Sequence, residues 1–523
     1  MPPPMKAKIM DDPIQKRMIT ASIMMATIMQ ALDTTIANVA LPHMQGALSA
    51  TQEQATWILT SYIVAAAIMT APIGILAARL GRKRLFMASV VGFTIASILC
   101  GAATGLIEMV VFRLVQGVFG AALVPLSQAV LLDINPPERH GPAMAMWGVG
   151  VMLGPILGPT LGGWLTEYYN WRWVFYINVP VGIAAFTGMW IFMPETEKTP
   201  GRRFDAFGFI LLSLFIGSLQ MMLDRGQSKD WFSSTEIICE AIIAGLSFYL
   251  FIVHILTAKA QPFLDPVMFK DRNYAISLVL MFVIGIVLLA SMALLPPFLQ
   301  SLMGYPVLLT GLVLAPRGIG VMIAMMIVGR LTGKLDARGL IATGLLLIAF
   351  SLHQMSLFNT QVPVSTIVST GLIQGFGLGF VFVPLSTLAY ATLPPHYRND
   401  AAAIFSLVRN IGSSVGISVV IALLARNTQI SHADLAAHLL PFGNAGRLLS
   451  SVRDTVDGTD GVAGLVILNA EITKQAATIA YLNDFILMMY VVFFSLPLLA
   501  ILQKRKPDKK SDELVDELAT AIE

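Results

Sequence analysis

The chain has 523 residues, of which 56% are hydrophobic and 12% are charged, and its formal net charge is only +3. Soluble globular domains carry about 25% charged residues, so this composition excludes an ordinary soluble protein. The small net charge indicates no nucleic-acid partner. The two cysteines, Cys100 and Cys239, lie in separate apolar runs, which predict neither a disulfide nor a metal site.

The N-terminal segment 1–17 is basic and is expected to be a cytoplasmic tail. The apolar run that follows, Met18–Leu41, exceeds the ~7–15 residues of a signal-peptide core and has no small-residue cleavage pattern after it. We therefore expect this run to be a retained first membrane span.

Apolar runs recur along the rest of the chain, and about fourteen of them reach the length of ~20 residues that a membrane-spanning helix needs. The prediction is an all-α polytopic membrane protein. It has a six-helix half at 18–193, two inserted spans with flanking loops at 194–273, and a second six-helix half at 274–502. The expected spans are Met18–Leu41, Trp57–Ala78, Leu85–Gly105, Met109–Leu132, Ala143–Thr166, Trp173–Met193, Phe207–Leu223, Ile237–Leu256, Ala275–Leu299, Val307–Leu331, Leu340–Phe358, Thr366–Ala391, Ala401–Ala425 and Tyr481–Leu502.

Lys and Arg gather in alternate loops, for example around Arg82, Arg202 and Arg338. The positive-inside rule places these loops in the cytoplasm, together with both chain ends and the C-terminal tail 503–523. The segment 426–478, before the last span, is predicted to be a long periplasmic loop.

Short motifs repeat between the two halves at a nearly constant spacing. Gln116-Gly117 recurs as Gln374-Gly375, and Pro125-Leu126-Ser127 recurs as Pro384-Leu385-Ser386. Parallel halves with a substrate site between them are typical of secondary transporters. A duplicated bundle with only a scaffolding role is the alternative, and it is disfavoured because the halves differ in their polar residues.

Asp33 in the first span and Arg113 in the fourth are ionisable residues in apolar surroundings, which cost at least ~2.5–3.5 kcal/mol each at the bilayer centre. Their counterparts in the second half are apolar or small, near Leu288 and at Gly371, so the repeat does not require them. We predict that both residues act in proton coupling. A static ion pair is the alternative for each.

Further polar residues lie inside the spans and are candidates for the substrate cavity. Arg317 and Arg409 either pair with an acid or bind an anionic substrate, and both possibilities are open. The full set of candidates is Gln30, Asn38, Gln116, Gln128, Arg317, Gln374, Arg409 and Asn410.

The fifth span carries a stripe of small residues that predicts close contact with another helix. Its prolines favour a kink. The stripe comprises Gly150, Gly154, Pro155, Gly158, Gly162 and Gly163. No phosphate-binding loop, dinucleotide fingerprint or metal-ligand cluster is found, so we expect neither a cofactor nor enzymatic activity. The expected source of energy is then an ion gradient, with the substrate's own gradient as the alternative.

These motifs resemble the major facilitator superfamily, specifically its fourteen-span drug/proton antiporters. The loop with Gly74, Arg79, Gly81 and Arg82 matches that family's conformational motif, although Ala78 stands where many members have Asp. This departure puts the usual acid-based gating contact of the loop in doubt. The segment Arg113–Gly120 is similar to the motif linked to proton transfer, and Gly150–Gly163 is similar to the antiporter motif.

The segments Leu223–Gly226 and Asp230–Ser234 resemble the EmrB-type branch of this family. The resemblance implies a multi-pass protein of the bacterial inner membrane that exports lipophilic compounds in exchange for protons. It also implies a periplasmic adaptor protein and a TolC-type outer-membrane channel as partners. The alternatives are a metabolite importer with the same fold and a membrane-embedded protein that does not transport.

Overall fold

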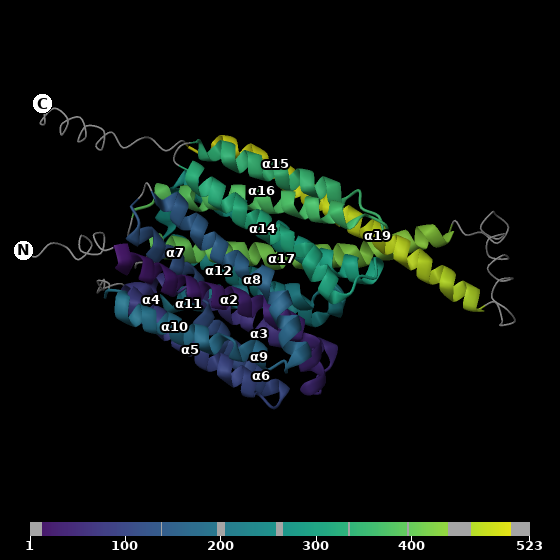
Figure 1. The fold of residues 1–523 in the computed structure, drawn as a ribbon, viewed down its shortest axis with the longest axis horizontal. Helices are drawn as coiled ribbons and strands as arrows, with labels where there is room; N and C mark the ends of the chain where they lie inside the picture. The colour runs from purple at the N-terminus through teal and green to yellow at the C-terminus, as the bar shows by residue number, and fades with distance from the viewer. Residues whose placement is uncertain are drawn as a thin grey trace, which may run out of the picture.

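The computed structural model describes residues 13–136, 139–195, 204–257, 265–332, 335–394, 397–437 and 462–503. In these ranges the secondary structure is helical, with short turns and loops between the helices and one isolated bridge between Thr332 and Leu335. Thirteen helices of this described part are long and apolar enough to cross a membrane, or up to 14 if one bent helix pair forms a single span. The predicted all-α polytopic fold is therefore confirmed (Figure 1).

The first half is built from helices that run back and forth through one bundle. Its helices are α2 (Pro13–Ala47), α3 (Gln52–Thr70), α4 (Ile73–Leu80), α5 (Arg82–Ala102), α6 (Leu106–Gly120), α7 (Leu123–Ile134), α8 (His140–Tyr168), α9 (Trp173–Tyr176) and α10 (Asn178–Phe192). The expected second span, Trp57–Ala78, is broken between α3 and α4 by a bend of 60°. Pro72 stands at this break, where its missing N–H removes one helical hydrogen bond.

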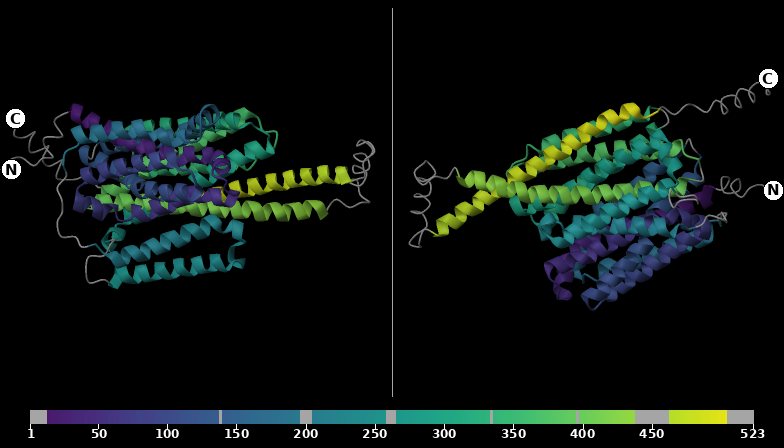
Figure 2. Two further views of the ribbon diagram at one scale, coloured as in Figure 1. Left: turned by 90° about the horizontal axis from the view of Figure 1, so that it is seen from below. Right: turned by 180° about the vertical axis from the view of Figure 1, so that it is seen from behind.

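The inserted spans form an antiparallel helix pair beside the main bundle (Figure 2). They are α11 (Ala206–Arg225) and α12 (Thr235–Thr257), joined by the short 3₁₀ turns η2 (Gln227–Lys229) and η3 (Trp231–Ser233). Helix α11 contacts α3 of the first half and α17 of the second half. The hydroxyl of Ser418 on α17 donates a hydrogen bond of 2.6 Å to the carbonyl of Leu223.

The second half repeats the first with longer final helices. It contains η4 (Pro266–Lys270), α13 (Arg272–Pro297), η5 (Phe298–Leu302), α14 (Val307–Leu331), α15 (Ala337–Met355), α16 (Val364–Ala391), α17 (Arg398–Ala437), α19 (Val462–Ser495) and η7 (Leu496–Ile501). Helix α5 begins at Arg82 and helix α15 just before Arg338, at one end of the bundle, which we call the basic end. The opposite end is called the far end.

The predicted loop 426–478 differs from the structure, because α17 continues to Ala437 and α19 begins at Val462. Polar residues after Arg426 end the hydrophobic run, but alanine and leucine still favour a helix there. The two helices cross and project beyond the far end (Figures 1 and 2), where His432 and Asn469 lie 3.0 Å apart. Residues 438–461 of this predicted loop lie outside the described residues, as do 1–12 and 504–523 of the predicted tails.

The halves meet along a seam in which α8 packs against α14 and α16, while α4 and α7 pack against α17. Trp147 on α8 stacks on Phe382 of α16, with ring centroids 5.8 Å apart. Gly148 permits another close approach, since a Cβ there would lie 2.4 Å from the sulfur of Met325. Helix α8 therefore contacts two helices of the second half, whereas α4 and α7 contact one.

Candidate functional site

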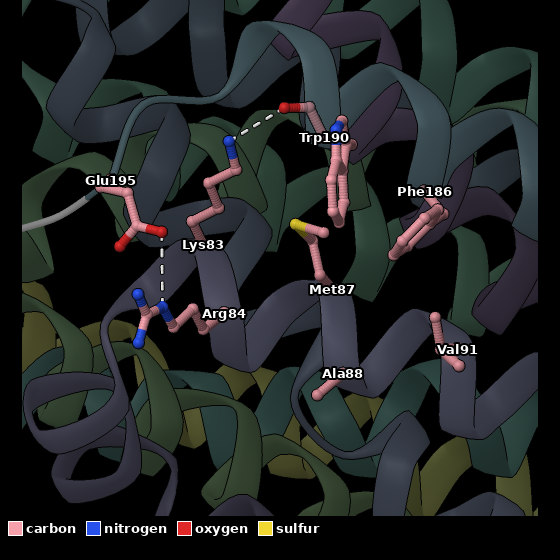
Figure 3. Close-up of a pocket in the computed structure, with 8 residues that line it drawn as sticks. All are labelled: Lys83, Arg84, Met87, Ala88, Val91, Phe186, Trp190 and Glu195. Atoms are coloured by element: carbon pink, nitrogen blue, oxygen red, sulfur yellow. Dashed lines mark hydrogen bonds and ion pairs between the residues drawn. The ribbon is translucent and has the colours of Figure 1, made fainter.

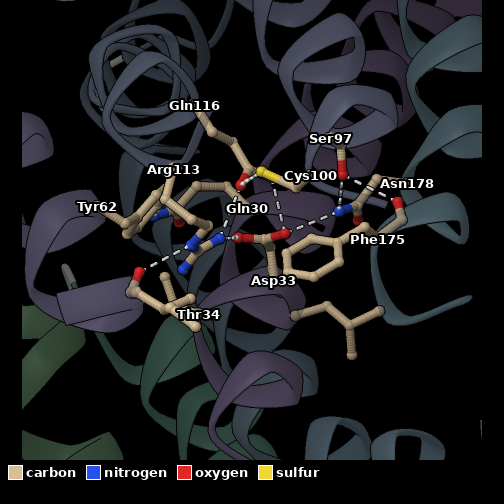
Figure 4. A network of polar contacts seen from close by, with 12 residues as sticks. Gln30, Asp33, Thr34, Tyr62, Ser97, Cys100, Arg113, Gln116, Phe175 and Asn178 are labelled. Atoms are coloured by element: carbon tan, nitrogen blue, oxygen red, sulfur yellow. Dashed lines mark hydrogen bonds and ion pairs between the residues drawn. The ribbon is translucent and has the colours of Figure 1, made fainter. Parts of the chain in front are cut away.

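Asp33 and Arg113 form an ion pair inside the first half, with Arg113 Nη1 2.7 Å from Asp33 Oδ2 (Figure 4). Their side chains are 0% and 1% exposed. The pair joins α2 to α6 across the bundle. Sequence alone placed both residues in spans but did not show that they touch.

The second oxygen of Asp33 accepts two hydrogen bonds from amides. Gln116 Nε2 and Asn178 Nδ2 each donate to Oδ1 at 2.9 Å. Asn178 also donates to the hydroxyl of Ser97 at 2.9 Å, and that hydroxyl donates to the carbonyl of Phe175. The carboxylate is therefore held by donors from α6 and α10 as well as by the guanidinium.

Arg113 has partners besides Asp33. Its Nε donates to the carbonyl of Ile58 at 3.2 Å, and its Nη1 donates to Gln116 Oε1 at 2.7 Å. The guanidinium also lies 4.4 Å from the ring centroid of Tyr62, a cation–π distance. Gln30 extends this group, because its amide donates to the Tyr62 hydroxyl at 3.0 Å. We call the whole set the polar network: Gln30, Asp33, Tyr62, Ser97, Arg113, Gln116 and Asn178.

The polar network includes three residues that were not singled out from the sequence, Tyr62, Ser97 and Asn178. Asn178 is buried at the start of α10. It could have been recognised from the sequence, because it is an amide residue in an otherwise apolar span. Tyr62 carried no such signal, because tyrosine is common in apolar helices. Its role follows from its position under Arg113.

The other cavity candidates do not join the network. Gln128 on α7 accepts a hydrogen bond from the hydroxyl of Tyr390 across the seam, at 3.4 Å. Arg317 on α14 donates to the Ser291 hydroxyl at 3.0 Å and to the Leu288 carbonyl at 3.3 Å. Asn38 is exposed on α2, while Arg409 and Asn410 are half-buried on α17.

Gln374, the counterpart of Gln116, is fully buried, and neither polar atom of its amide has a hydrogen-bond partner within the described parts of the chain. Near it, the place of Arg113 is taken by Gly371. A Cβ on Gly371 would lie 3.6 Å from Cβ of Arg317, so the buried cation of the second half comes from α14 instead of α16. The two halves therefore keep the same framework but place their charges differently.

Four glycines of α8 lie against α2, the helix that carries Asp33: Gly150, Gly154, Gly158 and Gly162. A Cβ on Gly154 would lie 2.4 Å from the backbone carbon of Ala31, and one on Gly158 would lie 2.1 Å from the Thr35 hydroxyl. A Cβ on Gly150 or Gly162 would also contact α2, whereas a Cβ on Gly163 would have no neighbouring atom within 4 Å. The Thr35 hydroxyl donates to the Gly154 carbonyl at 3.0 Å. Pro155 belongs to the same helix, which links α2 to the seam between the halves.

The loop motif lies at the basic end. Gly74 on α4 faces the second half, since a Cβ there would lie 3.1 Å from Cα of Asp400 on α17. Gly81 adopts a φ of 88°, which favours glycine, and Arg82 forms an ion pair with Asp133 at the end of α7. Arg79 is exposed in the last turn of α4.

A groove of about 670 Å³ runs between α5 and α10 at the basic end (Figure 3). Met87, Val91, Phe186 and Trp190 give it an apolar lining, and Lys83 donates to the carbonyl of Trp190 at 2.9 Å. No residue of the polar network lines this groove. It is therefore separate from the candidate site.

The sequence model of the Major Facilitator Superfamily matches residues 23–417 of the chain. The chain belongs to this superfamily. The chain is similar to the fatty acid resistance protein FarB of Neisseria gonorrhoeae, at 36% identity covering 91% of this chain and 94% of FarB. It is equally similar to the multidrug export protein EmrB of Escherichia coli K12, at 35% identity covering 92% and 95%. The predicted resemblance to EmrB-type exporters is confirmed.

Two solved structures share the fold at low sequence identity. The human organic anion transporter MFSD10 superposes with a TM-score of 0.58 at 14% identity, covering 92% of this chain and 100% of MFSD10. The proton:xylose symporter XylE superposes with a TM-score of 0.59 at 13% identity, covering 94% and 99%. Family and relatives together indicate a multi-pass transporter of the bacterial inner membrane, and not an enzyme.

Proposed function

We propose that this transporter exports lipophilic compounds in exchange for protons, and that Asp33 binds the exchanged proton. The observation that carries the proposal is the burial of Asp33 in an ion pair whose members both keep other contacts. A buried ionisable residue inside a membrane span is expensive, so it is a functional candidate by default. The alternative, a static ion pair, is what the experiments below are designed to exclude.

Protonation of Asp33 would remove its charge and weaken its link to Arg113. The neutral acid still accepts from the amides of Gln116 and Asn178, and Arg113 still has the Ile58 carbonyl and the Tyr62 ring. Protonation of Asp33 therefore mainly weakens the connection between α2 and α6. Because proton binding that differs between two conformations shifts their populations, this link can drive a change of conformation.

The glycine face of α8 provides a route from Asp33 to the seam. Helix α2 touches α8 at Gly154 and Gly158, while the opposite side of α8 packs on α14, with Ile156 against Gly318. A shift of α2 must therefore move α8 or open its contact with α2. In our proposal this coupling lets proton binding at Asp33 rearrange the interface where the substrate binds.

The substrate class we propose is lipophilic, with weakly acidic amphiphiles such as fatty acids included. FarB is named for fatty acid resistance and EmrB for multidrug export. Arg317 is 8% exposed, and no carboxylate lies within ion-pair distance of it in the described ranges. A substrate carboxylate would supply the missing counter-charge.

We further propose that the projecting helices α17 and α19 bind a periplasmic adaptor, which in turn contacts a TolC-type channel. The pair extends past the bundle at the far end, and its tip region carries exposed residues such as Asn469. A photo-crosslinking residue at position 469 should capture an adaptor in cells. The same residue at position 195, at the basic end, should not.

The proposed exchange is tested in inside-out vesicles that contain a pH-sensitive dye and an acidic lumen. Adding a transported compound to the outside should release protons from the lumen at a rate that depends on the protein. The panel should contain a fatty acid, a neutral lipophile and a lipophilic cation. Uptake without any proton movement would identify a uniporter and contradict the proposal.

A further inference from the structure

Asp484 lies on α19 in the second half and is 1% exposed. Both oxygens of its carboxyl group are buried without a hydrogen-bond partner in the described residues. Asp33 differs sharply, because a guanidinium and two amides donate to it. Asp484 is thus a second acid inside a span, and no hydrogen bond or ion pair from the described residues stabilises its charged form.

The repeat shows that this acid is not required by the architecture. From Trp171 to Trp190, the pattern of buried, half-buried and exposed residues is the same as from Tyr481 to Ala500. This alignment places Val174 at the position of Asp484, and Val174 is 0% exposed. An apolar side chain therefore fills the equivalent place in the first half, and the second half carries an acid there instead.

Helix α19, which carries Asp484, packs against α13, α15, α17 and η5. The titratable group beside it is Tyr481, one turn away on the same face of α19. In the described residues, no ion pair or hydrogen bond joins its carboxyl group to a basic side chain of these helices, namely Arg272, Arg338, His353, Arg409, Arg426 or His432. A charged carboxylate without partners is far more costly to bury than the neutral acid, so Asp484 is accommodated here as the protonated group.

A groove of about 450 Å³ approaches this position near the far end, between η5, α17 and α19. Polar side chains of Ser301, Thr428 and Gln429 line it, and Tyr481 also lines it. Asp484 does not line the groove, but it follows Tyr481 by three residues on the same face of α19 and is one helical turn deeper in the bundle.

We propose that Asp484 is a second proton-binding residue of the transport cycle, loaded from the far end through this groove. This inference rests on the proposed proton exchange. Water in the groove delivers the proton to the carboxylate, and the neutral acid is then buried as seen here. Release requires a conformation in which Asp484 again meets water or a donor, and there the carboxylate becomes charged.

The number of exchanged protons is the quantity to measure. In inside-out vesicles without a membrane potential, the steady-state concentration ratio of a neutral substrate rises about tenfold per pH unit for each coupled proton. Two coupled protons give the wild type about a hundredfold change per pH unit. We expect Asp484→Asn to lower this to about tenfold, and we expect the same of Asp484→Val, which installs the residue of the first half.

Asn483→Ala, at the exposed neighbouring position, is the matched control and should retain the wild-type slope. A wild-type slope shared by both Asp484 variants would overturn the inference while leaving proton exchange intact. A wild type with no pH dependence would instead refute the proposed function itself. Asp484→Val should remain folded in either case, because it replaces an unpartnered polar group with an apolar one.

Discussion

Arg113 lies between Asp33 and the ring of Tyr62, 2.7 Å from the carboxylate oxygen and 4.4 Å from the ring centroid. The cation is therefore held on two sides, by an acid on α2 and by an aromatic ring on α3. Loss of the acid's charge leaves it with the ring and two carbonyl oxygens. This arrangement makes the strength of the α2–α6 link depend on the protonation of Asp33.

The first prediction concerns the stability of this pair. Asp33→Asn keeps the size of the side chain but leaves Arg113 without a counter-charge. Removing one member of a buried pair costs about 3–5 kcal/mol, and the remaining contacts of Arg113 should keep the loss near the lower value. Adding Arg113→Gln to this variant should restore part of the stability. Thermal unfolding of the wild type, both single variants and the double variant in detergent measures the coupling.

The second prediction concerns the glycine face of α8. Gly154→Ala places a methyl group 2.4 Å from the backbone of Ala31, so α2 and α8 must separate, at a cost of about 1–3 kcal/mol. Export should fail although the protein still inserts. Gly163→Ala is the control, because nothing lies within 4 Å of that position. Equal export by the two variants would show that the α2–α8 contact is dispensable.

The third prediction concerns the seam at the basic end. Gly74→Ala would place a methyl group against Asp400 and so disfavour the packing of α4 on α17. Ala145 is buried on α8 against Gly329, so a cysteine there reports opening of the seam. If Gly74→Ala lowers the free energy of seam opening by ~1.4 kcal/mol, this cysteine should react about tenfold faster with a water-soluble thiol reagent. Gly105→Ala, with open space around it, should leave the rate unchanged. A rate unaffected by Gly74→Ala would mean that the seam adjusts without opening.

The fourth prediction concerns orientation. Cysteines at Glu195, at the basic end, and at Ser228, in the turn between α11 and α12, are both exposed. In intact spheroplasts, an impermeant thiol reagent should label position 228 and should reach position 195 only after the membrane is opened. Labelling of both positions in sealed cells would contradict the positive-inside orientation.

Much of the fold was predictable because the membrane imposes a simple pattern. Each helix buries its own backbone polar groups, so a run of apolar residues long enough to cross the bilayer identifies a span. The bend at Pro72 and the helical ends of the segment 426–478 were not predicted. Each has a local cause that hydropathy does not detect, namely the missing N–H of Pro72 and the helix-favouring alanines and leucines after Arg426.

The candidate site was predictable only in part. Asp33, Arg113 and Gln116 stood out as polar residues in apolar runs, and the structure brings them together. Gln128, Arg317 and Gln374 stood out for the same reason but lie elsewhere. The hydropathy of a sequence indicates which polar residues lie inside the membrane. The partner of such a residue depends on the rotation and register of its helix, which a single sequence does not reveal. The proton-coupling role of Asp33 and Arg113 stays a prediction.

The most direct test compares uphill export with passive exchange in wild type and Asp33→Asn. Inside-out vesicles with an imposed pH gradient should concentrate a lipophilic substrate when they contain the wild type or Glu108→Gln, an exposed control on α6. Vesicles with Asp33→Asn should exchange labelled for unlabelled substrate but should reach the same concentration on both sides. Concentration of substrate by Asp33→Asn to the wild-type level would contradict the account and leave the ion pair a purely structural element.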